Sequence, residues 1–155
     1  MPINRLLQGA GGLSRPLRVS ATAAFVVGGL LIVWSAYIHF HLWQAVGYRH
    51  IPTIGPLFIL QSIAGLVTGI LVIGVRRVWA AVLGVGFALA TLIGFVISVE
   101  HGLFGFRDQW SAPFGREALV IEMATMFVLA AGIVLCLFGS GARERGRVSV
   151  AGFQH

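Results

Sequence analysis

Four long apolar stretches alternate with short polar segments along this chain of 155 residues. None of the stretches contains Asp, Glu or Arg, and they run over residues 19–48, 51–75, 78–99 and 123–142. A helix needs about 20 mostly apolar residues to cross the hydrocarbon core of a bilayer. The pattern therefore predicts an all-α protein, a four-helix transmembrane bundle whose successive helices run antiparallel, up and down.

Local signals refine the ends of the expected helices. Pro56 suits a first helical turn, and Gly139 is typical of a helix stop. The expected spans are 20–41, 56–75, 78–101 and 115–138. The expected division of the chain is an N-terminal segment 1–18, a transmembrane domain 19–139 and a basic tail 140–155.

Charge gives the predicted bundle an orientation. Hydrophobic residues make up 57% of the chain and charged residues 10%, and all eleven basic residues are arginine. Eight arginines flank the termini or the short turn at 76–77, and three lie on the other side. The positive-inside rule then places both termini in the cytoplasm. Nucleic-acid binding would need a basic face interleaved with aromatic residues, which this distribution does not provide.

The other ionisable residues gather at the opposite, outer edge of the predicted membrane. Four of the five histidines and four of the five acidic residues fall there: His39, His41, His50, His101, Glu100, Asp108, Glu117 and Glu122. Ionisable groups at membrane depth are costly and usually indicate a site. The outer edge is therefore where chemistry is expected.

The direction in which each residue points around its helix separates inward-facing candidates from candidates at the rim. Packed faces of membrane helices use small and polar residues, and each expected span has one such stripe. Toward the outer edge the four stripes end in His39, Gln61, His101 and Glu122, which we expect to share one layer. His41 lies about 200° from His39 around the helix, and Glu100 about 100° from His101, so both are expected at the rim.

Three chemical interpretations stay open for this His/Gln/Glu cluster. A b-type heme would use His39 and His101 as axial ligands from facing helices. A transition-metal ion would use His39, His101 and Glu122, with His41, His50 or Glu100 as a further ligand. Alternatively, the cluster is a polar network, in which Glu122 pairs with a histidine and Gln61 and His50 complete the set, because buried polar groups in lipid must find partners.

One part of the sequence carries a resemblance. The segments His39-Phe40-His41-Leu42-Trp43, Gly47-Tyr48-Arg49 and 51–61 (IPTIGPLFILQ) are similar to a pattern in small uncharacterised four-span bacterial membrane proteins. The resemblance covers the end of the first span and the start of the second. It implies a multi-pass protein of the bacterial plasma membrane, and it implies no activity or cofactor.

Three functions follow from these patterns as hypotheses. The first is a cofactor- or metal-binding membrane protein with a redox or accessory role. The second is a non-catalytic packing or assembly subunit, either of a homo-oligomer or of a larger membrane complex. The third is a small proton-coupled transporter, in which Glu122 and a histidine relay protons. The lipid bilayer is the expected partner in all three, and the sequence names no enzymatic reaction.

Overall fold

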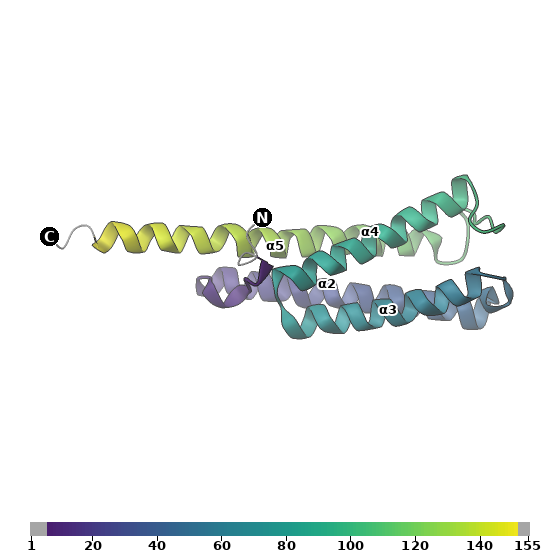
Figure 1. The fold of residues 1–155 in the computed structure, drawn as a ribbon, viewed down its shortest axis with the longest axis horizontal. Coiled ribbons are helices and arrows are strands. Elements are labelled where there is room, and N and C mark those ends of the chain that lie inside the picture. The colour runs from purple at the N-terminus through teal and green to yellow at the C-terminus, as the bar shows by residue number, and fades with distance from the viewer. Residues whose placement is uncertain (1–5, 152–155) are drawn as a thin grey trace.

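Four long helices form the protein in the computed structural model, which describes the backbone of residues 6–151 and the side chains of residues 6–139. The helices lie side by side (Figure 1) and are α2 (Arg15–His41), α3 (Ile54–Val75), α4 (Val78–Glu100) and α5 (Gly115–Ala151). Within the described residues there is no β-strand. Each of the four helices contains a stretch long and apolar enough to cross a membrane, so the prediction of an all-helical fold with four candidate spans is confirmed.

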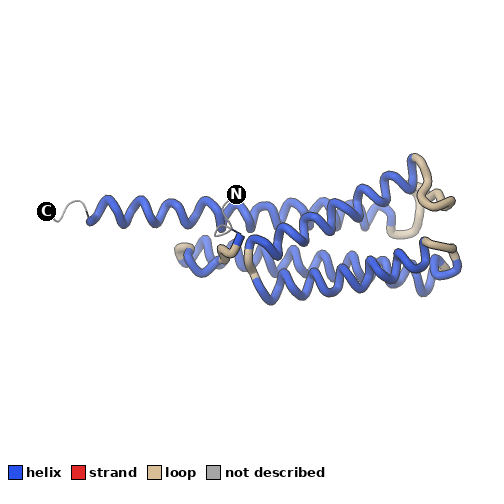
Figure 2. Tube along the Cα trace, viewed as in Figure 1, coloured by secondary structure: helices blue, strands red, loops and turns tan. Residues whose placement is uncertain are grey.

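The connections differ at the two ends of the bundle (Figure 2). At one end α3 and α4 are joined only by Arg76, in the left-handed conformation with a φ of 50°, and Arg77. The N-terminal segment lies against this short turn, because the Val78 amide donates to the Gln8 carbonyl over 3.0 Å. The other end carries two longer connections, residues 42–53 and 101–114, and we call it the long-loop end.

Helix α5 is longer than the sequence predicted. The expected stop at Gly139 does not occur, and the helix continues beyond the bundle to Ala151 (Figure 1). Glycine lowers helix propensity by about 1 kcal/mol but accepts helical dihedral angles, and no proline follows to break the helix. Among the residues whose side chains are described, α5 is long and apolar enough to cross a membrane over Gly115–Gly139.

Small residues bring the helices into close contact. A Cβ atom at Gly69 of α3 would lie 2.8 Å from the backbone oxygen of Gly29 in α2, so the two backbones almost touch there. Leu129 of α5 is fully buried and fills the space left by Gly28 of α2 and Gly84 of α4. Packing of this kind replaces the hydrophobic driving force that is missing between helices in lipid.

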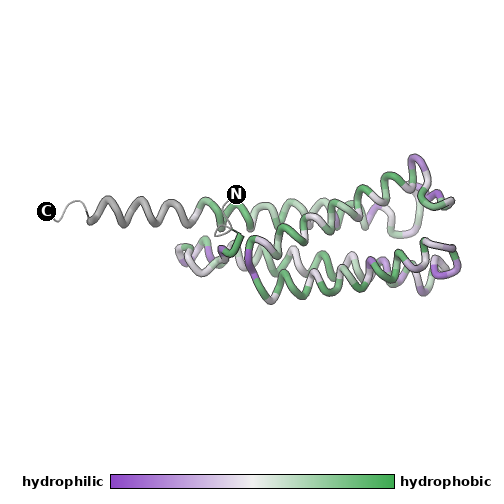
Figure 3. The backbone as a smooth tube through the Cα atoms, viewed as in Figure 1, coloured by the Kyte–Doolittle hydropathy of each residue, from purple (hydrophilic) through white to green (hydrophobic). Residues whose placement is uncertain are grey.

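The outward faces of the helices are apolar. Large exposed side chains include Leu60, Val67 and Ile70 on α3 and Phe127 on α5. Coloured by hydropathy, the coloured parts of the helices are green to white over most of their length, and purple is frequent at the long-loop end, at the short turn and near the start of α2 (Figure 3). Exposed apolar surface of this extent is what lipid contact requires.

Replacing Gly69 with alanine tests the close contact between α2 and α3. The G69A methyl group would meet the backbone of Gly29 and Val33, so the midpoint of unfolding in mixed detergent should fall. Gly74, on the same helix, has open space around it, and G74A should be neutral or stabilising by about 1 kcal/mol. Equal midpoints for the two variants would contradict this helix packing.

Candidate functional site

A buried carboxyl group links α2 and α5. Ser35 of α2 donates a hydrogen bond to Oε1 of Glu122 in α5, and the two side chains are each 1% exposed. The second carboxyl oxygen, Oε2, is buried and has no hydrogen-bond partner. Such an atom in an apolar environment is unusual and calls for an explanation, for example a proton, a water molecule or a ligand.

Two further hydrogen bonds between helices bring side chains of α3 and α4 into the same part of the bundle. Gln61 of α3 donates to the Thr91 hydroxyl of α4, which in turn donates to the Phe87 carbonyl over 2.9 Å. Next to Gln61, Ser62 donates to the Ala36 carbonyl of α2 over 2.8 Å. Every long helix thus contributes to what we call the polar layer, which consists of Ser35, Gln61, Ser62, Thr91 and Glu122.

His39 lies one turn from the polar layer toward the long-loop end. Its Nδ1 is 2.9 Å from the carbonyl oxygen of Ser35, the residue four positions earlier in the helix. A carbonyl can only accept, so Nδ1 carries the proton and donates, and Nε2 of the neutral ring is an acceptor. The ring lies 5.3 Å from the ring of Phe58, which orients it.

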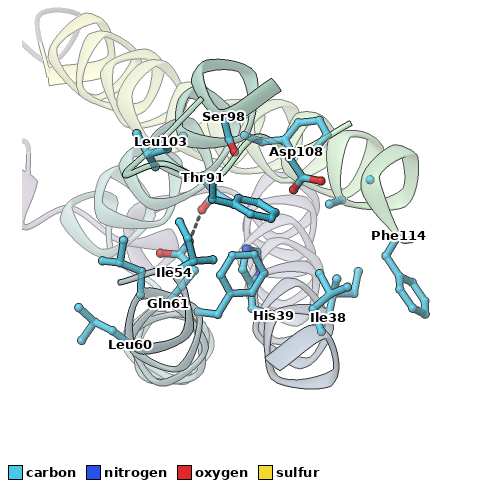
Figure 4. A pocket seen from close by; sticks show the side chains of 18 of the residues that line it. Ile38, His39, Ile54, Leu60, Gln61, Thr91, Ser98, Leu103, Asp108 and Phe114 are labelled. Atoms are coloured by element: carbon cyan, nitrogen blue, oxygen red, sulfur yellow. Dashed lines mark hydrogen bonds between the residues drawn. The ribbon is translucent and has the colours of Figure 1, made fainter. Parts of the chain in front are cut away.

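A cavity of about 260 Å³ lies above the polar layer, and we call it the long-loop cavity (Figure 4). Residues of both α3 and α4 line it, and α4 diverges from α3 toward the long-loop end (Figure 1). His39, Gln61, Thr91, Ser98 and Asp108 are its polar lining residues. The other lining residues are apolar side chains and glycines: Ile38, Leu42, Ile54, Leu57, Phe58, Leu60, Ala90, Gly94, Phe95, Leu103, Phe106, Pro113, Phe114, Gly115 and Ala118.

The wall of the cavity is open between α3 and α4. Leu60 and Ala90 line the cavity and are also exposed on the outside of the bundle, with 61% of the surface of Leu60 accessible. A Cβ atom at Gly94 would meet nothing within 4 Å, so this stretch of α4 leaves free space. This side of the cavity is flanked by the apolar outer faces of both helices.

The two long connections meet over the cavity. Tyr48, from the first connection, is buried, and its hydroxyl lies 3.5 Å from Oδ1 of Asp108 in the second. The Tyr48 ring packs against Phe58 at 4.7 Å and Phe106 at 5.6 Å. Burial, followed by the charge and hydrogen bond of Asp108, raises the pKa of Tyr48 to about 12.

The structure separates His101 from His39. Ser62 contacts Ala36, and its neighbour Gln61 contacts Thr91, so these positions share one level. His39 lies three residues beyond Ala36, whereas His101 lies ten residues beyond Thr91, an offset of about 10 Å along the bundle. His101 is exposed and does not line the cavity; the expected layer containing both histidines is wrong, and Thr91 is the residue that α4 contributes.

The other candidate ligands lie apart from one another. His41 packs its ring edge-on against Phe114 at 5.4 Å, Glu100 is exposed, and His50 accepts a hydrogen bond from Arg49 over 3.0 Å. Among the residues described, no group of three or more His, Cys, Asp or Glu side chains is placed to hold a metal ion. Of the predicted members, His39, Gln61 and Glu122 occupy neighbouring levels within the bundle.

Sequence reasoning left out Ser35, Ser62 and Tyr48 as members of the site. Ser35 stands on the predicted small-residue stripe of the first span, so its inward position could be foreseen but not its bond to Glu122. Tyr48 has the sequence context of an aromatic anchor in the headgroup region, and nothing local indicates its contact with Asp108. Both pairings join segments distant in sequence.

Titration of Tyr48 tests the contact between the two connections. In a Tyr37→Phe background Tyr48 is the remaining tyrosine, and its ultraviolet absorbance should change near pH 12 rather than at the ordinary 10.0. Ionisation is disfavoured in the folded state, so the associated stability is complete below about pH 10 and is lost between about pH 10 and 12. Asp108→Asn should lower the midpoint without restoring the ordinary value, because burial remains. A midpoint at the ordinary value before unfolding would refute the buried position.

Comparison with protein-family models, curated proteins and solved structures gave no match for this chain. Function is therefore inferred from the long-loop cavity and the polar layer alone.

Proposed function

We propose that this membrane protein binds a small, mainly apolar molecule with one polar group in the long-loop cavity. The observation that carries the proposal is the cavity itself, which has an apolar wall and a few convergent polar groups at its inner end. This combination is the usual character of small-molecule sites. The opening between α3 and α4 supports entry of the molecule from the bilayer.

The polar lining defines the chemistry of the ligand. His39 presents Nε2 as an acceptor, and Gln61 donates to Thr91 while its carbonyl is available to accept. A ligand hydroxyl or similar donor fits these acceptors. A volume of about 260 Å³ is close to the lower limit of ligand pockets, about 300 Å³, and favours one ring or a short chain over a macrocycle.

The orientation in the membrane is part of the proposal. The arginine distribution supports an antiparallel bundle with both termini in the cytoplasm, which puts the long-loop end outside. The resemblance to small four-span bacterial proteins supports the plasma membrane as the location. The ligand would then be taken from the outer half of the bilayer.

A cofactor held by His39 is the second candidate. Histidines that ligate metals almost always donate their other ring nitrogen to a carbonyl or carboxylate, and the Nδ1 contact with the Ser35 carbonyl has this form. Heme b or a transition-metal ion could use Nε2 as one ligand. A second axial ligand from His101 would require α4 to move by about two turns along the bundle, since the offset is about 10 Å.

Filling the cavity tests ligand binding. In a thermal-shift screen of the purified protein with small phenols, aromatic alcohols and quinones, a compound that binds should raise the unfolding temperature. Gly94→Leu should abolish this shift, because leucine would occupy the free space of the cavity.

The matched control is Gly86→Leu. Gly86 lies on the same helix and does not line the cavity, and a Cβ atom there would also meet nothing within 4 Å, so this variant should respond as wild type does. Shifts of equal size in the two variants would overturn the cavity as the binding site. No thermal shift with any compound, together with no co-purifying small molecule in native mass spectrometry, would contradict ligand binding in the cavity.

Absorption spectroscopy and elemental analysis test the second candidate. If His39 ligates heme, hemin added to the detergent-purified protein should give a Soret band that is lost in His39→Ala and retained in His41→Ala. Stoichiometric metal that disappears in His39→Ala would support a metal ion instead. A protein that gives no Soret band with added hemin and contains no stoichiometric metal would exclude a cofactor at His39.

A further inference from the structure

The polar layer lies directly beneath the long-loop cavity. His39 lines the cavity, and Ser35 is one turn deeper on the same face of α2. Ala118 lines the cavity, and Glu122 is one turn deeper on the same face of α5. Ser35 and Glu122 therefore each lie four residues, about 6 Å of helix rise, deeper in the bundle than a residue that lines the cavity.

The other side of the polar layer is closed. Toward the short turn, large buried side chains fill the bundle: Ile32, Val72 and Leu129, followed by Phe25, are each 0% exposed. These side chains belong to one continuous apolar cluster. The cavity thus lies on one side of Glu122, and a packed apolar barrier lies on the other.

We infer that Glu122, held by Ser35, is a proton-binding site that exchanges protons with the long-loop cavity and is closed toward the short-turn end. The inference goes beyond ligand binding, and it rests on the proposed function only for the route through the cavity. It does not depend on which molecule the cavity binds.

The surroundings of Glu122 favour a proton over another partner for Oε2. The members of the polar layer from α3 and α4 are the neutral side chains of Gln61, Ser62 and Thr91. One turn along α5 from Glu122, Thr125 is also neutral and donates to the Ile121 carbonyl. On α2 the nearest titratable group is His39. At the cavity roof the carboxylate of Asp108 is shared with Tyr48.

A charged carboxylate in an apolar span without a cation is costly. A proton on Oε2 removes the charge, while Oε1 keeps accepting from Ser35. In the exchange step the Oε2–H bond breaks, and the proton passes to a water or a ligand hydroxyl at the cavity floor. Return of a proton from the same side restores the acid.

Infrared spectroscopy of the full-length protein in lipid tests this site, with D2O as the probe. The protonated carboxyl should give a C=O stretching band that is lost in Glu122→Gln. The band should lose amplitude as the pH is raised, and it should shift promptly when D2O replaces H2O. Ser35→Ala should keep the band but displace it, because the hydrogen bond to Oε1 is removed.

Access through the cavity is tested with the same two glycine variants. Gly94→Leu should delay the D2O shift, whereas Gly86→Leu should exchange as fast as wild type. A prompt shift in Gly94→Leu would overturn the cavity route, and a spectrum unchanged by Glu122→Gln at every pH at which the protein is folded would overturn the proton site. Neither result depends on the thermal-shift screen, so ligand binding and proton binding can fail separately.

Discussion

The hydrogen bond between Ser35 and Glu122 is the interaction on which the arrangement of the site depends. A carboxyl group in an apolar helix cannot turn to water, so it must find a partner on another helix. Ser35 provides that partner and aligns α5 with α2 at this level. Ser62 aligns α3 with α2 through the Ala36 carbonyl, and Gln61 aligns α3 with α4 through Thr91.

The bundle is closely packed on the short-turn side of the polar layer and contains open space on the long-loop side. On the short-turn side of the polar layer, glycines let α2 and α3 approach to near backbone contact, and Leu129 closes the centre. On the long-loop side α4 diverges, and the space is only partly refilled by aromatic side chains from the two connections (Figures 1 and 4). The cavity is a consequence of this change, and the polar layer is its floor.

This arrangement relates the three functional hypotheses to one another. A cavity with His39 at its inner end serves ligand or cofactor binding, and a carboxyl group beneath it serves proton exchange. A polar network that only sets helix register would need the hydrogen bonds but neither the cavity nor an unpaired Oε2. The unpaired oxygen and the cavity volume are therefore the features that distinguish a functional site from a packing device.

The sequence alone determined which segments form helices long and apolar enough to cross a membrane, and which faces of these helices are packed. Length and hydropathy are properties of each segment, and a stripe of small and polar residues follows from helical periodicity, so His39, Gln61 and Glu122 could be placed inward. The predicted end of α5 was wrong, because glycine weakens a helix without being forced to end it.

Only the tertiary structure decided which inward residues meet. Thr91 and His101 are ten residues apart on α4. Which of the two reaches the polar layer depends on the position of α4 along α3 and α2. That setting arises from contacts such as Gly29 with Gly69 and Gln61 with Thr91, between positions distant in the chain. No local pattern encodes such a pairing, since helical phase defines a direction around each axis but not a common depth among four of them.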